Sequence, residues 1–94
     1  MTESKRQEED RIKIVVRQTG LSRSTVRYYI EVGVVSERLT QEDLAELRRA
    51  RRLRELDVNR AGVEIILRMR RRILELRKEI EQLERLLDRG RDAT

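Results

Sequence analysis

Apolar residues recur at helical spacing in four stretches of this 94-residue chain, and short polar segments separate the stretches. In the first stretch they begin at Ile12 and continue until Gly20, a residue that suits the left-handed end of a helix. Ser22 can cap a second, short helix, and Gly33 can end it. Two short helices joined by a tight turn predict a helix-turn-helix.

The third stretch predicts a longer helix over residues 40–56. Thr40 and Asp43 approximate a capping box at its start, because their side chains can each bond the other's backbone N–H. The apolar residues then follow a three-residue step along one face, and they are Leu44, Leu47, Ala50, Leu53 and Leu56. Asn59 can cap the last helix.

The fourth stretch has the strictest pattern of the chain. Its apolar residues alternate steps of three and four, and they are Ile66, Met69, Ile73, Leu76, Ile80, Leu83 and Leu87. Heptads of this kind indicate a coiled coil rather than a helix of a globular core. A helix over residues 60–88 would be about 40 Å long at 1.5 Å per residue. Nothing else in the chain can cover such a stripe, so the pattern predicts a homodimer with these seven residues in its interface.

The fold class expected is therefore all-α, with a long C-terminal dimerisation helix. The helix-turn-helix domain is expected over residues 11–58 and the coiled-coil helix over residues 59–89. Residues 1–10 and 90–94 are polar and lack apolar periodicity, so both are expected to be tails, the first of them disordered.

Composition narrows the function classes. Charged residues make up 44% of the chain, and the net charge of +5 favours an acidic partner such as nucleic acid. The chain has no Cys and no His, so we expect no metal site and no cofactor. With no nucleophile–base pair and no phosphate-binding loop, it is not expected to be an enzyme. No apolar run approaches a membrane span, and a cytoplasmic location is expected.

The segment "TGLSRSTVRYYIEVGVV" resembles the N-terminal domain of MerR-type regulators, in which a Thr-Gly-Leu-Ser turn precedes a helix containing Arg-Tyr-Tyr and then a Gly with two apolar residues. The resemblance covers most of the chain, from Ile12 to Leu87. It implies a DNA-binding transcriptional regulator that dimerises through its C-terminal coiled coil.

The resemblance and the chemistry of the side chains together give a set of DNA-binding candidates. A recognition helix places its N-terminal residues against base edges, and arginine can bond guanine in two places. The resemblance implies that Arg27 and Tyr28 contact the DNA backbone and that Tyr29 packs inward. The candidates are Ser22, Arg23, Ser24, Thr25, Arg27, Tyr28, Arg49 and Arg52.

Two departures from the MerR pattern leave an alternative open. MerR-type domains usually carry a β-hairpin wing before the third helix, but only "SERL" lies between Val35 and Thr40 here. Asp57 stands where the family often has Gly. The C-terminal half also resembles two small sub-groups, the heat-shock repressors and the CbpM-like chaperone modulators. The second resemblance implies binding to the J-domain of a DnaJ-type cochaperone instead of DNA.

Overall fold

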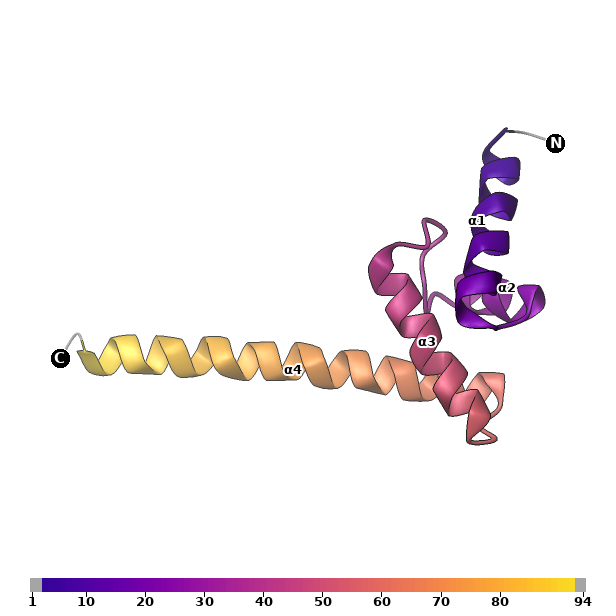
Figure 1. The fold of residues 1–94 in the computed structure, drawn as a ribbon. Helices are drawn as coiled ribbons and strands as arrows, with labels where there is room; N and C mark the ends of the chain where they lie inside the picture. Colours follow the sequence, from indigo (N-terminus) through magenta and orange to yellow (C-terminus); the bar gives the residue numbers. More distant parts are fainter. Residues whose placement is uncertain (1–2, 93–94) are drawn as a thin grey trace.

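The computed structural model describes residues 3–92, and this part of the chain is all α-helical, with no β-strand (Figure 1). The helices are α1 (Glu3–Thr19), α2 (Arg23–Glu31), α3 (Gln41–Glu55) and α4 (Arg60–Asp92). The predicted fold class, a helix-turn-helix unit followed by a long C-terminal helix, is confirmed.

Both expected tails differ from the structure. In place of a disordered segment over residues 1–10, α1 begins at Glu3. The segment contains no Gly or Pro, and its Glu, Lys, Arg and Gln side chains are good helix formers. At the other end, α4 continues through Gly90 to Asp92, and basic residues in its last turn complement the helix dipole. Residues 1, 2, 93 and 94 of the expected tails lie outside the described part of the chain.

The core forms where α1, α2, α3 and the start of α4 meet. The first three helices contribute most of their predicted apolar faces, but Leu56, which follows the last residue of α3, is 73% exposed. The start of α4 contributes Val63 and Leu67, which lie outside its predicted stripe. The largest of the fully buried side chains are Ile12, Val26, Tyr29, Val34, Leu47, Val63 and Leu67. Tyr29 is fully buried, as expected from its place beside Val26 on the inner face of the second helix.

The connection between α2 and α3 takes the place of a β-hairpin. Gly33 has a φ of +79°, and the N–H groups of Val34 and Val35 then both donate to the Tyr29 carbonyl oxygen, at 2.9 and 3.3 Å. At the far end of the connection the predicted capping box is present, with Thr40 and Asp43 each bonding the other's backbone N–H. The connection is therefore short, and hydrogen bonds fix both of its ends.

The turn between α3 and α4 is also short. Asp57 adopts a left-handed φ of 65°, a conformation that Gly adopts more readily, which agrees with the Gly that the resemblance led us to expect at this position. The Asn59 side chain accepts a 2.8 Å hydrogen bond from the Gly62 N–H, so the predicted cap of the last helix is present.

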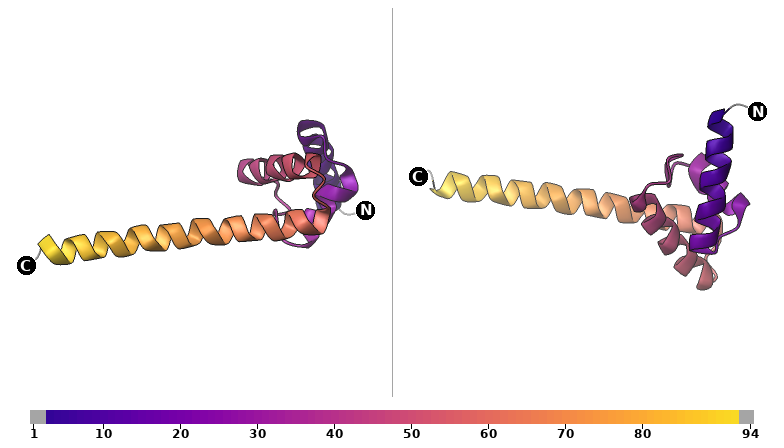
Figure 2. Two further views of the ribbon diagram at one scale, coloured as in Figure 1. Left: turned by 90° about the horizontal axis from the view of Figure 1, so that it is seen from below. Right: turned by 45° about the horizontal axis from the view of Figure 1, so that its top comes forward.

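The outer part of α4 stands away from the rest of the molecule. All views show α1, α2, α3 and the first turns of α4 gathered at one end, with the remainder of α4 extending into solvent (Figures 1 and 2). The radius of gyration is 18.1 Å, whereas a compact domain of this length would have about 12 Å. Every residue from 71 to 92 is exposed, including the apolar residues of the predicted seam. Within the described residues, this stripe has no cover.

Candidate nucleic-acid interface

The turn before α2 sets the direction of that helix. Gly20 has a φ of +74°, and the Ser22 side chain then accepts a 3.2 Å hydrogen bond from the Thr25 N–H as the predicted cap. Thr19 locks the turn from the other side, because its hydroxyl bonds both the Val15 carbonyl oxygen and the Leu21 N–H. The first turn of α2 is therefore held in one orientation.

Three of the candidate side chains project from this first part of α2 into solvent. They are Arg23, Ser24 and Arg27, and Arg23 and Arg27 are one helical turn apart on the same side of the helix. Ser24 lies beside the Ser22 hydroxyl, with 3.2 Å between the two oxygens. Within residues 3–92, Arg23 makes no ion pair, so its guanidinium is open to an anionic partner.

Thr25 does not lie on this surface. It is only 6% exposed, and its hydroxyl accepts a 2.8 Å hydrogen bond from the Ser22 hydroxyl. Its placement among the DNA-binding candidates is therefore corrected. The reason is the helical register, which turns Thr25 toward the core together with Val26 while Ser24 and Arg27 face outward.

Tyr28 also has a different neighbourhood from the one expected. Its hydroxyl donates a 2.8 Å hydrogen bond to Glu64 on α4, and the Arg60 guanidinium lies 4.9 Å from its ring centre. The bond to the Glu64 carboxylate is the main cause that raises the pKa of Tyr28. In this position Tyr28 joins α2 to α4.

Arg27 is paired with Glu9 of α1, and both side chains are partly exposed. Glu9 shares a shallow hollow with four other charged residues of the two helices, Arg6, Asp10, Lys13 and Arg23. The α1 members of this hollow were not among the residues predicted from the sequence. Their spacing along the chain places Arg6, Glu9, Asp10 and Lys13 on one side of a helix, and this signal is visible only once the segment is recognised as helical.

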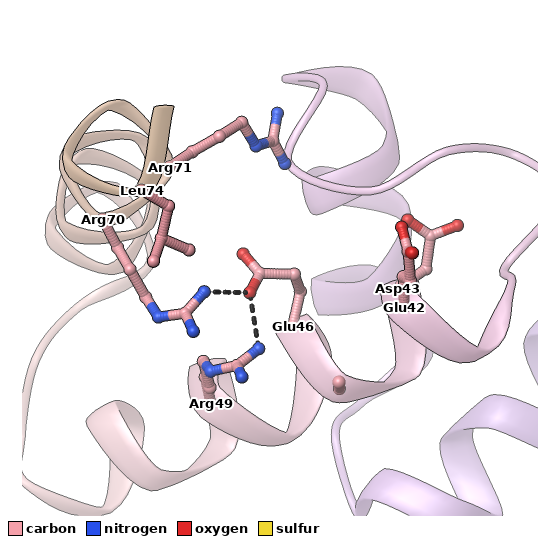
Figure 3. A pocket seen from close by; sticks show the side chains of 8 residues that line it. Glu42, Asp43, Glu46, Arg49, Arg70, Arg71 and Leu74 are labelled. Carbon is pink, nitrogen blue, oxygen red and sulfur yellow. Dashed lines mark hydrogen bonds and ion pairs between the residues drawn. The ribbon is translucent and has the colours of Figure 1, made fainter. Parts of the chain in front are cut away.

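The α3 candidates lie at a different place in the molecule. Arg49 pairs with Glu46 at 2.8 Å, and Arg70 of α4 approaches the same carboxylate oxygen at 3.2 Å (Figure 3). Arg52 borders a neighbouring hollow whose lining includes Arg49, Leu56 and Ile66. The structure thus brings Arg23 and Arg27 together beside α1, but it places Arg49 and Arg52 against α4.

Other arginines hold the helices together, and the sequence analysis did not identify them. Arg51 donates to the Thr19 carbonyl oxygen at 3.0 Å, where α1 ends. Arg68 and Arg71 of α4 donate to the carbonyl oxygens of Val32 and Val34, at 2.6 and 2.8 Å. Arg51, Arg68 and Arg71 therefore satisfy backbone carbonyls at helix ends and turns.

In residues 3–92 no group of acidic side chains is arranged to hold a metal ion. Over the same residues, none of the helices has the length and apolar character of a membrane span.

Comparison with known proteins identifies the family. Residues 11–70 match the MerR HTH family of regulatory proteins, a group of DNA-binding transcriptional regulators that are typically not enzymes. No curated protein and no solved structure gives a significant match. The family match leaves out the first turns of α1, from Glu3 to Asp10, and the outer part of α4. Because it covers well over half of the chain and all of the helix-turn-helix, the chain belongs to the MerR helix-turn-helix family.

Proposed function

We propose that this protein is a homodimeric transcriptional regulator that places α2 in the major groove of DNA. The observation that carries the proposal is the exposed first part of α2, where Arg23, Ser24 and Arg27 face solvent together on a helix that is fixed at its start by the Ser22 cap. Arginines at the N-terminal end of a recognition helix can bond guanine edges or phosphates.

The surroundings of α2 support this role because they make the helix rigid. The core holds it through Tyr29, and the Tyr28 hydroxyl ties it to Glu64 of α4. A rigid helix keeps Arg23 and Arg27 in a constant relation, which direct contact with base edges requires. Ser22 and Ser24 lie at the same end and can bond phosphates. Thr25, Tyr28, Arg49 and Arg52 are not part of this contact set.

The exposed stripe of α4 supports the homodimer. Its seven apolar residues are 40–63% exposed, which is far more than a soluble helix normally leaves open along one side. The helix has 33 residues, or about 50 Å, and all of its described residues beyond Leu74 are exposed. A second copy offers a stripe of matching length and period. A dimer of this kind would present two α2 helices to the half-sites of a palindrome.

A fluorescence anisotropy titration tests the DNA-binding proposal. The protein is titrated into the duplex upstream of its own gene and into random duplex, at about 50 mM and about 200 mM salt. We expect salt-sensitive binding with preference for the upstream duplex. Arg27→Gln should weaken binding and lower the salt slope by about one. Weak binding that is equal for both duplexes and unchanged in the variant would reject the proposal.

A second candidate function is the modulation of a chaperone through a J-domain, the role implied by the CbpM-like resemblance. The specific observation that favours it is the connection over residues 33–40, which has no strand and so lacks the wing that supplies phosphate contacts in MerR-type proteins. Titration of a J-domain in the same assay separates the two functions. Micromolar or tighter binding of the J-domain together with failure of the duplex test would favour the chaperone role.

A further inference from the structure

The first turns of α1 bring a carboxylate to the recognition helix. Glu9 pairs with Arg27, although the segment from Glu3 to Asp10 lies outside the family match. The same segment supplies Asp10 to the hollow beside Arg23. A carboxylate bound to a guanidinium offers it the same kind of oxygen acceptor as a DNA phosphate does. Both cannot occupy the same donor atoms of Arg27 at once.

We propose that Glu9 is an intramolecular competitor for DNA: it occupies Arg27 in the free protein, and a DNA phosphate must displace it for α2 to bind. This inference rests on the proposed function of α2 and adds a control on its affinity. Glu9 lowers the affinity for DNA of any sequence, because the free protein loses the Glu9–Arg27 pair on binding. The displaced carboxylate also remains close to the phosphates and repels them.

Two features of the structure favour a contact that can be exchanged. Both side chains are partly exposed, Arg27 at 44% and Glu9 at 32%, so a phosphate can approach the guanidinium from solvent. Arg23 provides an internal comparison, because it has a similar place on α2 but no ion pair within the described residues. DNA can therefore meet Arg23 first and displace Glu9 from Arg27 afterwards.

The size of the effect follows from the exposure of the pair. A partly exposed ion pair contributes a free energy that corresponds to about a two- to fivefold change in affinity. Glu9→Gln should therefore strengthen binding to both the upstream and the random duplex by about this factor. Gln has nearly the same helix propensity as Glu, so α1 should remain helical.

The test compares the full-length protein with four variants by anisotropy titration at about 50 mM salt. They are Glu9→Gln, Arg27→Gln, the double variant and the control Glu3→Gln, which removes the same charge from the same segment without touching Arg27. We expect Glu9→Gln to bind more tightly than Glu3→Gln. In the Arg27→Gln background the Glu9 substitution should strengthen binding by a smaller factor than it does with Arg27 present, because only the repulsion between Glu9 and the phosphates remains.

The outcomes separate the inference from the proposed function. If Arg27→Gln weakens binding but Glu9→Gln behaves like Glu3→Gln, the competitor role is rejected and the role of α2 stands. The competitor role is also rejected if Glu9→Gln strengthens binding equally with and without Arg27, because the effect is then general charge repulsion. If Arg27→Gln leaves the affinity unchanged, the assignment of α2 as the DNA-binding helix fails, and the competitor role fails with it.

Discussion

The Arg51 guanidinium occupies the space that a side chain at Gly20 would need. Its Nη1 atom donates a 3.0 Å hydrogen bond to the Thr19 carbonyl oxygen at the end of α1, and a Cβ atom built on Gly20 would overlap the same nitrogen. Gly20 also has a φ of +74°. Gly20, in the turn before α2, is therefore restricted twice, by its backbone conformation and by an arginine 31 positions later in the chain.

Replacement of Gly20 by Ala should destabilise the fold more than the same change at Gly33. Both glycines have φ near +75–80°, so both variants incur a backbone strain of about 1–2 kcal/mol. A Cβ at Gly33 meets no atom within 4 Å, whereas one at Gly20 must displace Arg51. The additional cost at Gly20 is the lost hydrogen bond, about 1 kcal/mol. Urea unfolding at one fixed protein concentration measures the difference.

The Arg51→Ala background provides the control for that comparison. Once the guanidinium is absent, Gly20→Ala incurs only the backbone strain, and its effect should equal that of Gly33→Ala. An excess at Gly20 that persists without Arg51 would show that the close approach is not the cause.

The adjacent tyrosines should respond in opposite directions to loss of the hydroxyl. The Tyr29 hydroxyl is buried and has no hydrogen-bond partner among the described residues, so Tyr29→Phe should stabilise the protein by about 1 kcal/mol. Tyr28→Phe loses the bond to Glu64 and should destabilise the protein. Thermal unfolding of the two variants measures both effects. A loss of stability in Tyr29→Phe would indicate that its hydroxyl does have a partner.

The pH dependence of stability provides a second test of the roles of Tyr28 and Tyr29. Burial raises the pKa of Tyr29, and the bond to Glu64 raises that of Tyr28. The folded state favours the protonated form of both tyrosines. The contribution of this preference to the stability is therefore fully present below the unfolded pKa of 10.0 and is lost as pH rises through the higher pKa values of the folded state. Each Phe variant should lose less stability above pH 10 than the unmodified protein.

The Asp43 carboxylate should be the side chain that contributes most to the stability of the connection between α2 and α3. It accepts hydrogen bonds from the backbone N–H and the hydroxyl of both Ser36 and Thr40. Asp43→Asn should therefore cost about 1–2 kcal/mol. Glu42→Gln removes a neighbouring charge from the same helix start and should cost only a few tenths. Equal effects of the two changes in urea unfolding would assign the stabilisation to the helix dipole.

Acid unfolding tests the same contribution of the Asp43 carboxylate to stability. Burial alone would raise the pKa of Asp43, but the hydrogen bonds from Ser36 and Thr40 outweigh it and lower the pKa below 3.8. Because the folded pKa is lowered, the contribution is present above pH 3.8 and is lost as pH falls through the folded value. Asp43→Asn should have a smaller loss of stability below pH 3.8 than the unmodified protein.

Features that depend on neighbours in the sequence could be predicted from it, and features that depend on distant residues could not. The caps at Ser22, Thr40 and Asn59 each involve residues only three positions apart, so the sequence pattern identifies them. Tyr28 instead bonds a residue 36 positions away. No local pattern indicates that partner.

The same distinction explains the outcome for α1 and for the arginines. Residues 3–10 have no apolar face, and pairing with the distant α2 helps to hold them in place through Glu9. The arginine-rich stretches over residues 48–54 and 68–72 are typical of a solvated or phosphate-binding surface. Arg68 and Arg71 nevertheless bond carbonyl oxygens 36 and 37 positions away. A charged side chain in a helix has no sequence signal that separates a phosphate contact from a carbonyl contact.

The seam of α4 gives the sharpest test of the proposed dimer. Leu76 lies in the middle of the apolar stripe, and Leu74 lies two residues away on another side of the helix with almost the same exposure, 40% against 39%. Leu76→Lys would bury an unpaired charge in each half of a symmetric interface. It should weaken the dimer by at least about tenfold, while Leu74→Lys should leave it nearly unchanged. Analytical ultracentrifugation over a dilution series measures both.

Loss of the partner should also be visible in the helix content. Residues 75–92 are all exposed and lie away from the core of their own chain, and isolated helices of this length are marginal in water. On dilution, Leu76→Lys should lose helical circular dichroism at concentrations where Leu74→Lys keeps it. If both variants remain equally dimeric and equally helical, the stripe is not the interface. If both become monomeric, the interface extends across the side of α4 that carries Leu74, and a dimer held by the seven-residue stripe alone is wrong.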